Sequence, residues 1–67
     1  MNAVEIAKAA EASAAPFKAV LAPEILRAVK LAYVAQWLAN QDDSTNSNVL
    51  VMRAQDAVHY INTGATA

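Results

Sequence analysis

The sequence predicts an all-α fold of about three helices. Apolar residues recur at helical spacing in three separate segments, each with a recognisable start or stop signal. The one run that is typical of a strand, residues 49–52, has no second strand to pair with. A chain of 67 residues makes one domain at most. We therefore expect a single helical domain over residues 1–67, with helices at about residues 2–21, 23–40 and 47–62.

The first predicted helix begins with a capping box, in which Asn2 and Glu5 each satisfy a backbone N–H at the helix start. Its apolar positions keep helical spacing through Pro16. A proline inside a helix removes one hydrogen bond and costs about 3 kcal/mol. We expect this helix to be kinked or broken near Pro16, either by bending or by restarting with Ser13 as a new N-cap.

The second and third predicted helices have clearer ends. The second starts at Pro23, because proline at the first helical position loses no hydrogen bond and Glu24 complements the positive end of the helix dipole. A polar loop follows at residues 40–48, where no side chain is apolar. The third predicted helix, residues 47–62, has one apolar face, and Gly64 stands where a C-terminal cap belongs.

Composition and charge argue against several classes of function. A net charge of −1 gives no global attraction to nucleic acid or to anionic lipid. One histidine without any cysteine provides no usual structural zinc site. The start of the chain does not resemble a secretory signal, and charged and polar residues interrupt its most apolar stretch, residues 21–39. We expect a cytoplasmic protein with no metal, no cofactor and no membrane partner.

Asp56 and His59 form the one pair that could resemble a catalytic arrangement. They lie three residues apart on one helix face, as a carboxylate and an imidazole can in general-base catalysis. Exposed pairs of this kind are common, and no nucleophilic serine or cysteine stands near them in the sequence. The sequence therefore predicts no catalytic residue and a protein that is not an enzyme.

The second predicted helix is apolar on nearly every face, so it must be buried on nearly every side. Two short neighbouring helices cover about half of it, and we expect the remainder to contact other protein. Four alanines form a stripe at about 100° per residue that would let another helix approach closely. The predicted interface residues are Leu26, Leu31, Tyr33, Val34, Trp37 and Leu38, and the stripe for close helix packing is Ala28, Ala32, Ala35 and Ala39.

The small size of the domain points to the same conclusion. A domain of about 60 residues buries only about 60% of the surface that its unfolded chain exposes. Small chains without disulfides or metals are commonly stabilised by a second chain. We expect a packed or intertwined homodimer that also binds a larger protein, as an adaptor or as an inhibitor that acts by steric occlusion. Tyr33, Trp37 and Leu38 are the expected anchors.

Two alternatives from other classes stay open. Lys18, Arg27 and Lys30 surround the first junction between helices and could contact DNA in a small transcriptional regulator. Three dispersed cations are a weak electrostatic footprint, so the sequence does not favour nucleic acid as the partner. The alanine stripe could also stack copies of the chain into a larger structural assembly.

Overall fold

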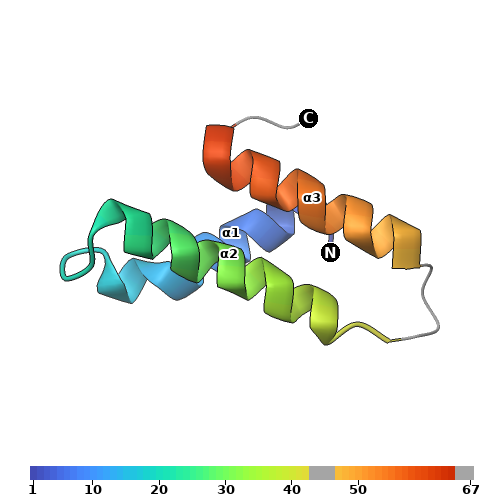
Figure 1. Ribbon diagram of the computed structural model, residues 1–67, viewed down its shortest axis with the longest axis horizontal. Coiled ribbons are helices and arrows are strands. Elements are labelled where there is room, and N and C mark those ends of the chain that lie inside the picture. Colours follow the sequence, from blue (N-terminus) through green and yellow to red (C-terminus); the bar gives the residue numbers. More distant parts are fainter. Residues whose placement is uncertain (43–46, 65–67) are drawn as a thin grey trace.

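A computed structural model describes residues 1–42 and 47–64, and it confirms the all-α prediction. Helix α1 spans Ala3–Ala14, and a short 3₁₀-helix, η1, spans Ala15–Phe17. The longer helices α2 and α3 span Pro23–Ala39 and Ser47–Thr63. All three α-helices contact one another. Figure 1 shows α2 and α3 running in opposite directions, with α1 behind them.

The start of α1 has the hydrogen bonds that the sequence predicted. The backbone N–H of Glu5 donates to Oδ1 of Asn2 at 2.9 Å, and the backbone N–H of Asn2 donates to Oε1 of Glu5 at 3.0 Å. Each side chain therefore satisfies a backbone donor that the first helical turn leaves without an intrahelical partner. The predicted capping box is confirmed.

The first helix ends earlier than the sequence predicted. α1 stops at Ala14 instead of continuing to residue 21, and η1 carries Pro16 in its first turn. Because proline has no backbone N–H, the α-helical hydrogen-bond pattern cannot continue through it. The predicted restart at Ser13 is wrong, since Ala14 is the N-cap of η1 and the Ser13 hydroxyl donates to the carbonyl of Ala10 at 2.8 Å.

The ends of α2 and α3 lie close to their predicted positions. Pro23 is the first residue of α2, and Asn40 caps its C-terminal end. Gly64 has a φ of +74°, the left-handed conformation that glycine adopts at helix ends, and its N–H donates to the carbonyl of Tyr60 at 2.7 Å. The predicted polar loop at residues 40–48 is described only in part, because residues 43–46 lie outside the described residues.

The core lies where α1 packs against the other two helices. Its buried cluster consists of Ile6, Ala7 and Ala10 from α1, Val34 from α2, and Ala54 and Ala57 from α3. Most of these side chains are alanine, and only Ile6 and Val34 are large among the fully buried ones. Small side chains at a contact allow two helix axes to approach closely. The close approach of α1 to α2 and α3 therefore depends on small side chains at the contact, where larger side chains would not fit.

We predict that enlarging one of these alanines destabilises the domain. Ala10→Leu places three extra carbon atoms in a site with no exposed surface, which we expect to lower the free energy of unfolding by about 1–3 kcal/mol. Ala12→Leu is the matched control, because Ala12 is exposed on the same helix. Urea unfolding at equal protein concentration measures both variants. Equal stabilities for the two variants would contradict the close contact of α1.

Candidate protein-binding surface

An apolar groove runs between α2 and α3. It has a volume of about 320 Å³ and is lined by residues of these two helices alone. Val34 and Ala54, which are both buried, also belong to the core beneath it. Among the residues that the structure describes, Gln55 is the only polar one that lines the groove, and no charged side chain does so. The full lining is Leu31, Val34, Ala35, Leu38, Val51, Ala54, Gln55 and Val58.

The predicted alanine stripe continues the groove across α2. All four alanines, Ala28, Ala32, Ala35 and Ala39, are exposed. Ala35 belongs to both the stripe and the groove lining. At about 100° per residue, Glu24 lies one turn before Ala28 on the line of the stripe, and Ile25 and Gln36 lie beside the stripe on the exposed side of α2. We call the groove and the stripe together the uncharged face. The predicted close packing stays a prediction about contacts with another molecule.

A hydrogen bond joins the two helices near one end of the groove. The Nε atom of Arg27 in α2 donates to Oδ1 of Asn62 in α3 at 2.8 Å. Both residues are exposed, and they are 35 positions apart in the sequence. Because α2 and α3 run in opposite directions, this bond brings the N-terminal end of α2 next to the C-terminal end of α3. Arg27 thus lies at the end of the uncharged face.

The six predicted interface residues do not form one surface. Leu31, Val34 and Leu38 line the groove, whereas the other three face towards α1 or the far flank of α2. Leu26 lines a separate pocket beside α1. Tyr33 and Trp37 are half-buried against the core and line a hollow of about 300 Å³ with Gln36, Asn40 and Gln41. The side-chain amide of Gln41 donates to the carbonyl of Trp37 at 2.7 Å at this hollow.

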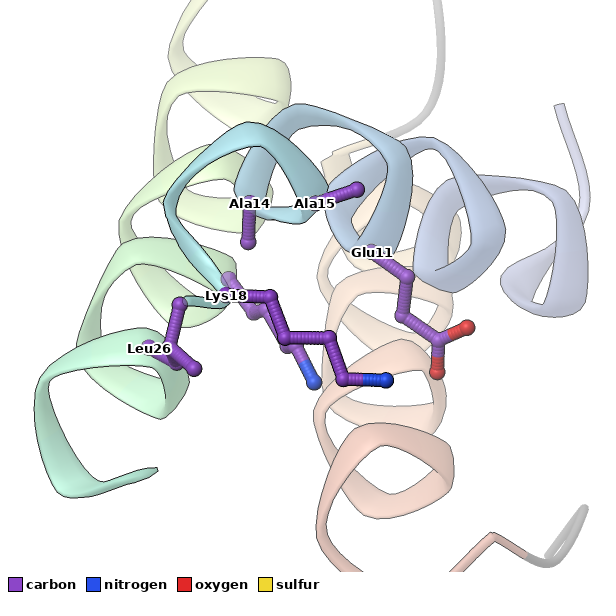
Figure 2. Close-up of a pocket in the computed structure, with 6 residues that line it drawn as sticks. Glu11, Ala14, Ala15, Lys18 and Leu26 are labelled. Carbon is purple, nitrogen blue, oxygen red and sulfur yellow. The ribbon is translucent and has the colours of Figure 1, made fainter. Parts of the chain in front are cut away.

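The three predicted DNA-contacting cations are also divided. Lys18 and Lys30 line the pocket of about 240 Å³ beside α1, together with Glu11, Ala14, Ala15 and Leu26. Figure 2 shows the side chains of Glu11 and Lys18 projecting to the same side of this pocket. Arg27 does not line it and instead bonds Asn62. An acidic side chain in the same pocket as two lysines weakens their attraction to phosphate.

The structure offers no second type of site among the residues that it describes. Asp56 and His59 are both exposed on α3. In the two described ranges, no group of three or more histidine, cysteine or acidic residues is placed to hold a metal ion. Of the helices in residues 1–42 and 47–64, none is long and apolar enough to cross a membrane.

The contribution of α3 to this surface was not predicted from the sequence. The sequence predicted one apolar face for the third helix, which includes Val51, Ala54 and Val58, and did not show which of these residues reach beyond the core. Val51 is 42% exposed, and Val58 is half-buried. The width of the apolar face on α3 was the available signal. When an apolar face is too wide for one neighbouring helix to cover, part of it stays exposed.

Exposed apolar residues near the connection between α1 and α2 were not predicted either. Phe17, Val20 and Ile25 are about half exposed or more. They lie in or beside the turn between these helices, away from the groove lining.

Comparison with known proteins adds no functional assignment. No protein-family model, curated protein or solved structure gives a significant match to this chain. The interpretation of the uncharged face therefore depends on its own geometry and chemistry.

We predict that the hydrogen bond from Arg27 to Asn62 contributes little to stability. Arg27→Ala removes one exposed hydrogen bond, and we expect a loss of about 0.5–1.5 kcal/mol in the free energy of unfolding. Arg53→Ala on the exposed side of α3 is the matched control and should change stability by less than about 0.5 kcal/mol. Urea titration compares both with the parent chain. A loss above about 3 kcal/mol would show that Arg27 has a larger structural role.

Proposed function

We propose that this chain is a non-enzymatic protein-binding module that docks through the uncharged face of α2 and α3. Its action would be that of an adaptor or an inhibitor that covers part of another protein's surface. The observation that carries the proposal is the open groove lined by apolar residues with one glutamine and no charge. The absence of charge over the adjoining alanine stripe extends the same surface.

The chemistry of this face suits a helix as its ligand. An apolar groove between two helices accepts the apolar side of a third helix, which is a recurring mode of protein recognition. The exposed alanines keep the surface of α2 shallow, so a docking backbone can approach closely. Exposed apolar surface that polar residues surround commonly marks a protein-interaction site.

The hollow beside Tyr33 and Trp37 is a second place where protein could bind. Aromatic side chains with an apolar body and a polar end are enriched at the centres of protein interfaces. These two side chains are half-buried against the core, so only part of each is available to a partner. We therefore assign them a supporting role, and the uncharged face the main one. A cytoplasmic location stays a prediction.

We predict that a photo-crosslinking amino acid at Ala35 captures protein in the native cell. Ala35 lies in the middle of the uncharged face, and its side chain is exposed, so the substitution should not disturb folding. The same amino acid at Asp56, exposed on the far side of α3, is the control. Mass spectrometry should find crosslinked protein, either this chain or another, from position 35 in clear excess over position 56.

Equal yields from the two positions, or none from position 35, would contradict the proposed function. Crosslinks to a second copy and crosslinks to a different protein both support a protein-binding face. The first outcome identifies the partner as this chain itself, and the second identifies it as another protein.

A further inference from the structure

We propose that the helix filling the groove is α2 of a second copy of this chain, packed antiparallel about a two-fold axis. This inference rests on the proposed function, because it names the partner of the uncharged face. A two-fold contact applies the same surface to itself, so that surface must be self-complementary. The uncharged face meets this requirement because it presents a hollow, the groove, beside a low ridge of alanines.

The lack of charge favours a second copy over a partner of opposite charge. In a two-fold contact, every charged group near the axis is repeated close to its own copy, and like charges that lose water repel strongly. The groove lining and the four stripe alanines contain no charged residue. A charged partner would find no complementary group on this face, whereas a second copy needs none.

The position of the groove along α2 defines the register of the two copies. The lining residues of α2 run from Leu31 to Leu38, so the centre of the groove lies between Val34 and Ala35. An antiparallel two-fold axis through that centre places Leu31 of each copy opposite Leu38 of the other. The two leucines of the α2 lining then meet each other, and Ala35 of each copy lies beside the axis.

The helix dipoles favour the antiparallel direction over the parallel one. In an antiparallel contact, the positive end of each α2 lies beside the negative end of the other. A parallel contact would place Glu24 and Arg27, near the N-terminal end of the face, beside a second Glu24 and a second Arg27.

The chain has enough exposed surface for a contact of standard size. The chain exposes 4524 Å², whereas the usual scaling for a folded monomer of 7.1 kDa gives about 4,100 Å². A stable interface of standard size covers about 800 Å² on each partner. Burying that area in a dimer would bring the exposed surface per chain below the value for a monomer of this mass.

Engineered disulfides test the register directly, since the chain has no cysteine of its own. In the antiparallel register, Ala35 of one copy lies opposite Val34 of the other, so two copies of Ala35→Cys come within the reach of a disulfide. Ala28→Cys, on the same exposed stripe, is the matched control. Its two copies would be separated by about 20 Å along the axis at 1.5 Å per residue.

We expect mild oxidation of Ala35→Cys to give a covalent dimer at least about tenfold faster than oxidation of Ala28→Cys, where a tenfold ratio corresponds to about 1.4 kcal/mol. Non-reducing electrophoresis measures both rates, and circular dichroism checks that both variants remain helical. Comparable fast crosslinking of both variants would overturn the antiparallel register, because a parallel contact places both pairs close together. Slow crosslinking of both would overturn the contact itself.

Sedimentation equilibrium of the parent chain and of Ala35→Glu tests the stoichiometry. The parent chain should be dimeric at protein concentrations from about 1 to about 100 μM. Ala35→Glu repeats a negative charge beside the two-fold axis and should raise the dimer dissociation constant at least about tenfold. Ala12→Glu, at an exposed position of α1, should leave the dimer dissociation constant unchanged. A folded parent monomer at about 100 μM would overturn the inference.

The same experiments distinguish failure of the proposed dimer from failure of the proposed protein-binding function. If the parent chain is a folded monomer and position 35 crosslinks to a different protein, the second copy is excluded and the proposed function stands. If position 35 captures no protein and the parent chain is monomeric, both are excluded.

Discussion

The close approach of α1 to the other two helices is the contact on which the rest of the structure depends. Ile6, Ala7 and Ala10 of α1 are fully buried, and the alanines among them allow close packing against α2 and α3. A core built mainly from alanine buries little apolar area per residue. Its stability therefore depends more on close packing of the side chains than on the amount of apolar area that they bury. This contact also orients α2 and α3, because both pack against the same side of α1.

The length of α1 determines what stays exposed. α1 has 12 residues, whereas α2 and α3 have 17 each. The shorter helix cannot cover the longer pair, and it contacts them from one side only. The groove on α2 and α3 is lined by neither α1 nor η1, so it stays open. Pro16 is the chemical reason for this length, because it ends the regular α-helix and leaves one 3₁₀ turn in its place.

The three functional classes raised by the sequence differ in how well the structure supports them. DNA binding would need its cations on one surface, but Lys18 and Lys30 line one pocket with Glu11 while Arg27 bonds Asn62. Stacking into a larger assembly and docking with one partner both need an exposed apolar face. A two-fold contact closes after two copies, whereas head-to-tail stacking continues, so the size of the assembly distinguishes them. The hollow beside Tyr33 and Trp37 lies on the other flank of α2, outside the contact of the proposed dimer.

The sequence by itself determined the helical class, the capping box at Asn2 and Glu5, and the starts of α2 and α3, because these depend on local backbone chemistry and spacing. It also indicated that α2 carries more apolar surface than two neighbours can bury. Only the tertiary structure decided which of those faces are open. Leu31 and Leu38 line a groove while Tyr33 and Trp37 pack towards α1, and the alanine stripe faces outward. Periodicity gives the angle of each residue about its own helix, but burial depends on where the other helices lie, and that is decided by packing between distant segments.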